Sequence, residues 1–97
     1  MGIREDYDFE YLVNEAERLV LDQLEVQLSE ADDAQVCMCQ ECVLDMAAYA
    51  LNKIKPVYRV SLMGNLYAKS LQGSEYEAEI KEVVAQAVKK IAANPSH

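Results

Sequence analysis

The sequence predicts a small, mainly α-helical protein that forms a single domain over residues 1–97. Three stretches repeat apolar residues at three- and four-residue steps, which is the period of one helical face. With 52% hydrophobic residues and only three glycines and two prolines, the chain is expected to fold. The predicted order is helix, cysteine loop, helix, short β-hairpin and helix. A chain of this length buries only about 60–65% of its unfolded surface, so a second subunit or a metal ion would stabilise it.

The first helix is predicted over residues 8–29. Leu21, Val26 and Leu28 lie off its main apolar stripe. A helix that is apolar on a second side is expected to pack against a second surface, which in so short a chain we expect to belong to a partner subunit. The main stripe consists of Phe9, Leu12, Val13, Ala16, Leu19, Val20 and Leu24.

A polar loop is predicted over residues 30–36, followed by the cysteine cluster and a second helix that ends near residue 55. Pro56 fixes that end, because proline cannot continue a helix and disfavours helical backbone in the residue before it. The apolar stripe of this second helix consists of Val43, Met46, Ala47, Ala50, Leu51 and Ile54.

After Pro56 the helical spacing gives way to residues that favour strands. Residues 57–62 and 66–71 are predicted to form a hairpin, joined at residues 63–65, where Gly64 and Asn65 can take positive φ. Ser74 and Glu77 then have the spacing of a capping box, which predicts the start of a third helix. Asn94 and Pro95 end this helix, whose stripe consists of Ile80, Val83, Val84, Ala87, Val88 and Ile91.

The charge of the chain is unevenly distributed. Residues 1–45 contain 13 acids and two bases, residues 46–97 contain four acids and seven bases, and the net charge is −8. This balance argues against binding to a nucleic-acid polymer, which needs a continuous basic face. No apolar run approaches the roughly 20 residues of a membrane span, and the first residues do not resemble a signal peptide. We therefore expect a cytoplasmic protein that binds neither nucleic-acid polymers nor membranes.

The cysteine cluster is the sharpest motif in the sequence. Cys37, Cys39 and Cys42 have C-x-C-x-x-C spacing, with the last cysteine near a helix start, where backbone N–H groups favour a thiolate. Thiolates bind zinc, and structural zinc takes four ligands. Asp45, one turn after Cys42, is the nearest candidate for the fourth, with Asp32, Asp33 or a second subunit as further options. The single histidine, His97, is expected to lie in a frayed tail. The alternatives are three reduced thiols that pack as small apolar groups and a Cys39/Cys42 redox dithiol.

A second candidate site combines basic and aromatic side chains. Planar guanidinium groups bind phosphate, and tyrosine rings can stack on bases. A three-residue turn in the predicted hairpin would place Arg59 across from Lys69, whereas a two-residue turn would place them on opposite faces. The alternative is a solvated surface on an acidic protein. The candidate ligand-binding residues are Lys53, Lys55, Tyr58, Arg59 and Lys69, with Tyr49 and Tyr67 nearby.

No catalytic arrangement is found in the sequence. It contains no glycine-rich phosphate loop, no G-x-S-x-G and no H-E-x-x-H. A Cys–His nucleophilic pair would require His97 to dock from the terminus. We therefore expect a protein that is not an enzyme.

The stretch from Cys37 to Tyr58 resembles the late-competence ComFB family. The matching residues read C-x-C-x-x-C-x-x-D, then A-L-N at residues 50–52, then P-x-Y at residues 56–58. Residues 10–13 are similar to the family's opening helix, although no asparagine precedes Tyr11 here. The resemblance is close over residues 7–58 and looser beyond.

The resemblance implies a small, mainly helical, cytoplasmic homodimer with zinc at the cysteine loop. It also implies a regulatory role in competence and motility, with binding of cyclic di-GMP, cyclic di-AMP or both, and signalling to a protein partner. A compact dianion with two purines suits the basic, tyrosine-bearing half of the chain, and its two-fold symmetry suits a two-fold dimer. The alternative function is a zinc-stabilised protein–protein interaction module without a small ligand.

Overall fold

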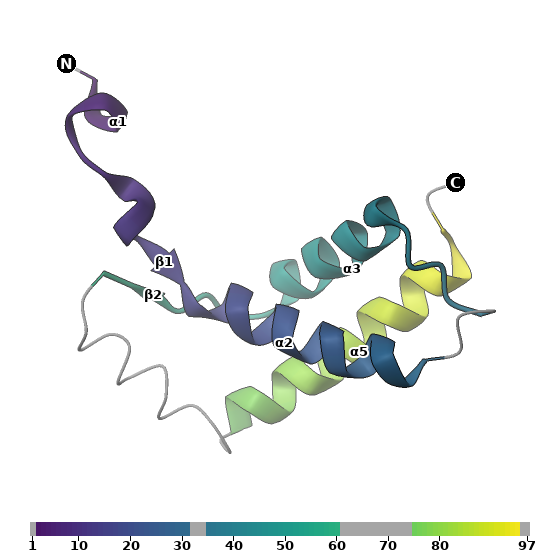
Figure 1. The fold of residues 1–97 in the computed structure, drawn as a ribbon. Helices are drawn as coiled ribbons and strands as arrows, with labels where there is room; N and C mark the ends of the chain where they lie inside the picture. The colour runs from purple at the N-terminus through teal and green to yellow at the C-terminus, as the bar shows by residue number, and fades with distance from the viewer. Residues whose placement is uncertain (1, 32–34, 61–74, 96–97) are drawn as a thin grey trace.

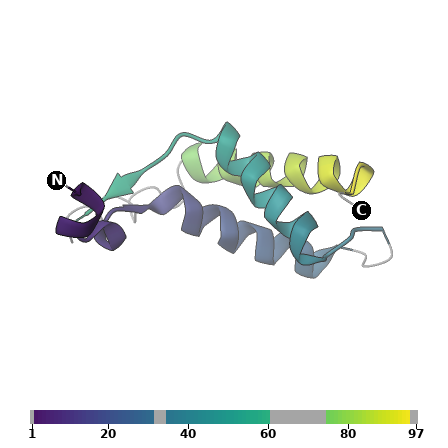
Figure 2. The same ribbon diagram turned by 90° about the horizontal axis from the view of Figure 1, so that it is seen from above.

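Three helices form the body of the protein: α2 (Glu15–Glu30), α3 (Gln40–Lys53) and α5 (Glu75–Ala93) (Figure 1). The structure, a computed structural model, describes residues 2–31, 35–60 and 75–95. α5 packs against both other helices, most extensively against α3. Seen from above, α3 lies across α2 and α5 (Figure 2). The predicted mainly α-helical fold is confirmed.

The core lies where the apolar stripes of the three helices meet. Met46 of α3, Val20 of α2 and Val84 of α5 are among the largest side chains with almost no exposed surface. Burying each such side chain favours folding by about 1.5–3 kcal/mol. Most of the predicted stripe residues of the second and third helices are therefore core positions, whereas Val43, Leu51, Val88 and Ile91 are only partly buried. The cluster comprises Ala16, Val20, Leu24, Met46, Ala47, Ala50, Ile54, Ile80, Val83, Val84 and Ala87.

The predicted start of the first helix is wrong. α2 begins at Glu15 rather than at residue 8, because Asn14 is its N-cap with extended backbone (φ −95°, ψ 107°). The Asn14 side-chain oxygen accepts hydrogen bonds from the N–H of Ala16 at 3.1 Å and of Val57 at 2.8 Å. The Glu15 N–H donates to the Val57 carbonyl at 2.7 Å. The two bonds to Val57 hold the backbone extended where the spacing of apolar residues predicts a helix.

The 3-10 turn η1 (Phe9–Tyr11) and a short strand, β1 (Val13–Asn14), replace the beginning of that predicted helix. β1 pairs antiparallel with β2 (Tyr58–Arg59), so that Val13 lies opposite Arg59. The described partner of residues 58–59 is therefore the segment before α2. The rest of the predicted hairpin and its register lie outside the described residues.

The other helix boundaries agree closely with the sequence. α3 ends at Lys53, two residues earlier than predicted, because Ile54 has extended backbone (φ −110°, ψ 144°) ahead of Pro56. α5 covers the predicted third helix, while the predicted cap at Ser74 lies outside the described residues. α2 continues through Glu30, and residues 32–34 of the predicted loop are not described.

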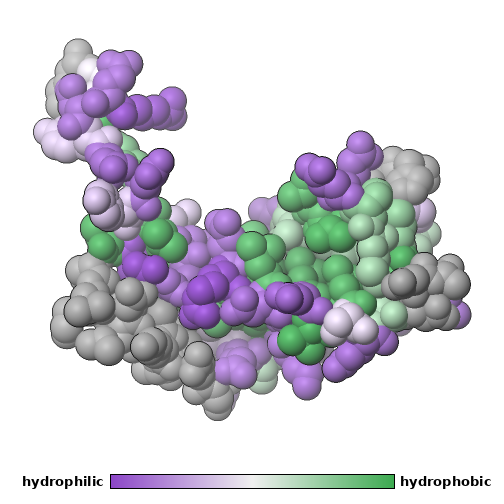
Figure 3. Space-filling model, viewed as in Figure 1, coloured by the Kyte–Doolittle hydropathy of each residue, from purple (hydrophilic) through white to green (hydrophobic). Residues whose placement is uncertain are grey.

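Residues 2–12 form an N-terminal arm. It contains the four-residue helix α1 (Ile3–Asp6) and the 3-10 turn η1 (Phe9–Tyr11), and neither has a buried residue. The arm leaves the helical body at β1 (Figure 1), and a hollow separates it from the body in the space-filling view (Figure 3). None of the helices in the described ranges is long and apolar enough to cross a membrane.

Candidate functional site

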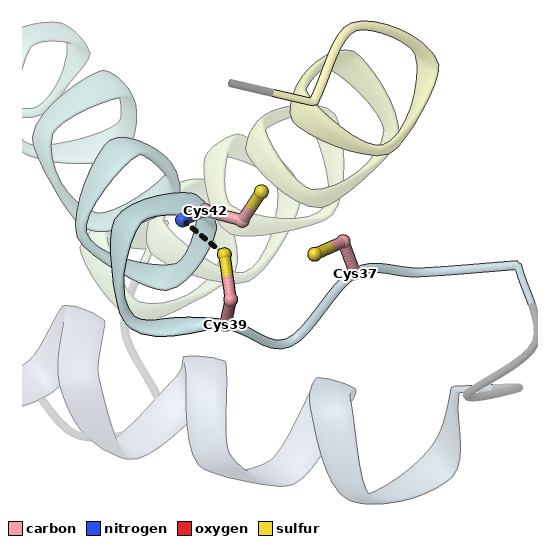
Figure 4. Close-up of side chains that lie close together, drawn as sticks. All are labelled: Cys37, Cys39 and Cys42. Atoms are coloured by element: carbon pink, nitrogen blue, oxygen red, sulfur yellow. Dashed lines mark hydrogen bonds between the residues drawn. The ribbon is translucent and has the colours of Figure 1, made fainter. Parts of the chain in front are cut away.

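The three cysteines converge at the start of α3. Cys37 and Cys39 lie in the segment before the helix, Cys42 lies in its first turn, and their sulfur atoms all lie within 4.8 Å of one another (Figure 4). Cys42 is fully buried, whereas the other two are half-buried. No disulfide joins them. The C-x-C-x-x-C spacing thus produces one compact group of sulfurs, which we call the cysteine corner.

The helix start explains this convergence. Cys39 is the N-cap of α3, and its sulfur accepts a hydrogen bond from the N–H of Cys42 at 3.4 Å. The Val43 N–H donates to the Cys39 carbonyl at 3.0 Å. Because the N-cap side chain folds back over the first turn, it comes close to the side chain three residues later. The turn therefore places two sulfurs together, and the extended segment before it brings the third.

The chemistry of the cysteine corner suits a soft metal ion. Tetrahedral zinc with bonds of about 2.3 Å places its sulfur ligands about 3.8 Å apart, so the three sulfurs need only a small contraction. The corner supplies three of the four ligands that structural zinc takes. A bound ion would fix the segment before α3 to the first turn of that helix.

The crowding of thiols affects their protonation. A hydrogen bond with the Cys39 backbone lowers the pKa of Cys37. Hydrogen bonds with the Cys39 and Cys42 thiols, desolvation and the charge of Cys39 all raise it, and together they outweigh the backbone bond, so that the pKa of Cys37 is raised. Several thiolates close together repel one another unless a cation neutralises them. Zinc supplies such a charge when bound.

The predicted fourth ligand does not join the cysteine corner. Asp45 is exposed on α3, and the described cluster of possible ligands contains only the three cysteines. Asp32, Asp33 and His97 lie outside the described residues.

Four of the five predicted ligand-binding residues follow one another where α3 leads into β2, over residues 53–59, which we call the basic connection. Lys53 is the last residue of α3, and its ammonium lies 5.0 Å from the centre of the Tyr49 ring, a cation–π arrangement. Lys55 is exposed, and its carbonyl accepts a hydrogen bond from the Tyr76 hydroxyl. Tyr58 is 63% exposed. Lys69 lies outside the described residues.

Arg59 faces a carboxylate instead of solvent. Its Nε donates to the buried carboxylate of Glu15, at the start of α2, and its side chain is only 22% exposed. Arg18 binds the other oxygen of Glu15 at 2.8 Å and also reaches Asp22 at 3.3 Å. One carboxylate is therefore shared by two guanidinium groups, and the single positive charge of this trio is offset by Asp22.

The electrostatics of this trio favour an ionised Glu15. Hydrogen bonds from Arg18 and Arg59 lower the pKa of Glu15, against the opposing effect of desolvation. Sequence reasoning missed both Glu15 and its N-cap, Asn14. The signal was present, because Asn14 followed by Glu17 has capping-box spacing, but the apolar period of residues 9–13 concealed it.

A hollow of about 610 Å³ is lined in part by Tyr58. Two of its lining residues are acidic, Glu17 and Asp22, and only Arg18 is basic. An anionic ligand is repelled more than attracted by this set. The lysine side of the basic connection is the better surface for an anion.

The fold and the cysteine corner define a small helical domain with a candidate thiolate metal site. The model of the family described as late competence development protein ComFB matches residues 13–95. The chain therefore belongs to the ComFB family. The solved structure of the late competence protein ComFB from Bacillus subtilis is similar to it, with a TM-score of 0.73, 23% sequence identity, and coverage of 88% of this chain and 92% of that one. No curated protein matches the chain.

Proposed function

We propose that this chain is a non-enzymatic regulatory protein of competence and motility whose basic connection binds a cyclic dinucleotide, cyclic di-GMP or cyclic di-AMP. The observation that carries the proposal is the exposure of Lys53, Lys55 and Tyr58 along one short segment. Ammonium groups bind phosphate as point charges, and a tyrosine ring offers a stacking face for a base. Lys69 is the remaining cation proposed for this surface.

The local charge supports an anionic ligand. Residues 46–60 contain three bases and no Asp or Glu. Arg59 is balanced by Glu15 and Arg18 also binds Asp22, so the available positive charge of this segment comes from Lys53 and Lys55. The rest of the protein carries the excess of acids, and a dianion is therefore drawn to this segment rather than elsewhere. Such a ligand matches a homodimer in symmetry, and the bound state would be passed to a protein partner.

The test is calorimetric titration with cyclic di-GMP and cyclic di-AMP near physiological salt. Reversing the charge of Arg59 would place two carboxylates together in a partly buried site, so the informative variant is Lys53→Glu/Lys55→Glu. We expect it to lower affinity at least about tenfold, because each charged hydrogen bond contributes about 1.5–3 kcal/mol. The matched control is Lys81→Glu/Lys89→Glu, which reverses two exposed lysines of α5. Absence of binding heat with either ligand would refute the proposal.

We also propose that the cysteine corner binds zinc through Cys37, Cys39 and Cys42, with Asp45 as the fourth ligand once its side chain, exposed in this structure, turns toward the sulfurs. Three thiols within 4.8 Å suit such an ion. Native mass spectrometry of the purified protein is expected to show one zinc per chain and two chains per particle. A reversible Cys39–Cys42 disulfide in metal-poor protein would support a redox role instead.

A second candidate function is a zinc-stabilised protein–protein interaction module without a small ligand. Its supporting observation is the exposure of Leu21 and Val26 on α2 and of Leu44 on α3, since apolar groups of this size favour a protein contact. In this function the lysines are solvated surface. Zinc content and subunit number would be unchanged, and neither cyclic dinucleotide would bind.

A further inference from the structure

The N-terminal arm has the composition of a docking segment. It contains four acids and one base, a net charge of −3. It also holds five of the eleven large apolar side chains that are exposed in the described residues, each between 46% and 67% exposed. A segment this apolar and acidic favours a partner that is basic and partly apolar. The five are Ile3, Tyr7, Phe9, Tyr11 and Leu12.

The basic connection and the residue after it match that partner. Lys53, Lys55 and Arg59 give residues 53–60 a charge of +3 with no acid. Tyr58 and Val60 add apolar surface, at 63% and 64% exposure. Because Arg59 is paired with Glu15, the charge available to a partner comes from the two exposed lysines, and it is opposite in sign to that of the arm. Both segments also expose aromatic or aliphatic side chains.

The register of β1 and β2 directs the arm away from the lysines of its own chain. Val13 lies opposite Arg59 and Asn14 opposite Tyr58, in antiparallel pairing. In an antiparallel pair, moving toward the N-terminus along one strand runs toward the C-terminus along the other. The arm thus leaves β1 on the side of Val60, whereas Lys53 and Lys55 precede β2. The arm projects from the body accordingly (Figures 1 and 3).

We propose that the arm of one chain docks on the basic connection of a second copy of this chain. In a two-fold pair each arm would cover the other chain's connection, so the contact is made twice. The family match begins at residue 13, so the arm lies outside the matched domain. The docking needs no nucleotide, but an anion bound at the same lysines would compete with it.

The test is a charge swap followed by sedimentation velocity. Lys53→Glu/Lys55→Glu makes residues 53–60 repel the acidic arm, and Glu5→Lys/Glu10→Lys makes the arm repel the unmodified connection. We expect each variant alone to self-associate at least about tenfold more weakly than the unmodified chain, as the loss of close charge pairs predicts. An equal mixture of the two is expected to recover association, because each variant's arm then faces an opposite charge on the other.

Recovery in the mixture separates docking between chains from docking within one chain, which mixing cannot restore. Lys81→Glu/Lys89→Glu, with the same charge change on α5, is expected to self-associate like the unmodified chain. Circular dichroism verifies that each variant is helical. The proposal is overturned if the two variants associate like the unmodified chain, if their mixture recovers nothing, or if the unmodified chain stays monomeric.

Discussion

The two ends of α3 carry the two candidate sites and differ in how their side chains are organised. At its start, three sulfurs lie within 4.8 Å of one another. At its end, Lys53 lies over Tyr49, Lys55 is exposed, and Arg59 is bound to Glu15. A helix turn with its cap brings neighbours in sequence together, whereas an extended connection sends successive side chains in different directions. Side chains can therefore converge through local structure at the start of α3. At its end, only a ligand or a second chain could bring them together.

The largest effect is expected from Cys37→Ser. If the cysteine corner holds zinc, loss of this half-buried ligand removes the metal and lowers the free energy of unfolding by about 3 kcal/mol or more, because metal binding is coupled to folding. Elemental analysis and urea unfolding measure both effects. Met38→Ser in the same segment is the control. If zinc content and stability were unchanged, the three thiols would be packing groups rather than metal ligands. The two ends of α3 would then not differ in holding a local site.

A smaller loss is expected from Glu15→Gln. The substitution leaves the two guanidinium groups of Arg18 and Arg59 without their carboxylate, at a cost of about 1–3 kcal/mol. It should also loosen β2 from α2. Urea unfolding gives the free energy, with the exposed neighbour Glu17→Gln as control. Equal stability of the Glu15→Gln and Glu17→Gln variants would mean that Arg59 is not held by its ion pair with Glu15.

The same carboxylate predicts a pH dependence. The pKa of Glu15 is lowered by its arginine partners, so its contribution is complete above the unfolded-state pKa of about 4.3. That contribution is lost as the pH falls through the lower folded-state pKa. The stability difference between the unmodified chain and Glu15→Gln should therefore be constant above about pH 5 and shrink as the pH falls below about 4.3. A difference that stays constant with pH would contradict this.

Asp45→Asn tests whether the cysteine corner recruits its fourth ligand from the same helix. We expect about a tenfold loss of zinc affinity, which corresponds to about 1.4 kcal/mol, because an amide is a poorer ligand than a carboxylate. Competition with a chromogenic chelator measures it, and Glu41→Gln is the control. A change below about twofold would assign the fourth position to a group other than Asp45.

The smallest effect is expected from Asn14→Ala. It removes the N-cap of α2 and the bond to the Val57 N–H, at a cost of about 1 kcal/mol. Because Val57 lies within the basic connection, hydrogen exchange of the Val57 and Arg59 amides should also become faster. Asn52→Ala, an exposed asparagine near the end of α3, is the control. Unaltered exchange would show that β2 is held by Glu15 alone.

The sequence by itself determined the helices whose apolar period and end signals agree, and it determined the cysteine corner. α5 follows its stripe, α3 ends just before Pro56, and three cysteines within six residues converge because a helix start brings them together. All of these depend on contacts between near neighbours, which propensity and spacing describe.

Only the tertiary structure determined the backbone conformation and the pairing of the region around β1 and β2. The period of residues 9–13 favours a helix, but Asn14 and Glu15 bind Val57, which is more than 40 residues away in the sequence, and this contact keeps the backbone extended. The same contact gives Arg59 a buried carboxylate and directs the arm away from the lysines. Pairing between distant segments has no local period, so spacing along the chain cannot reveal it.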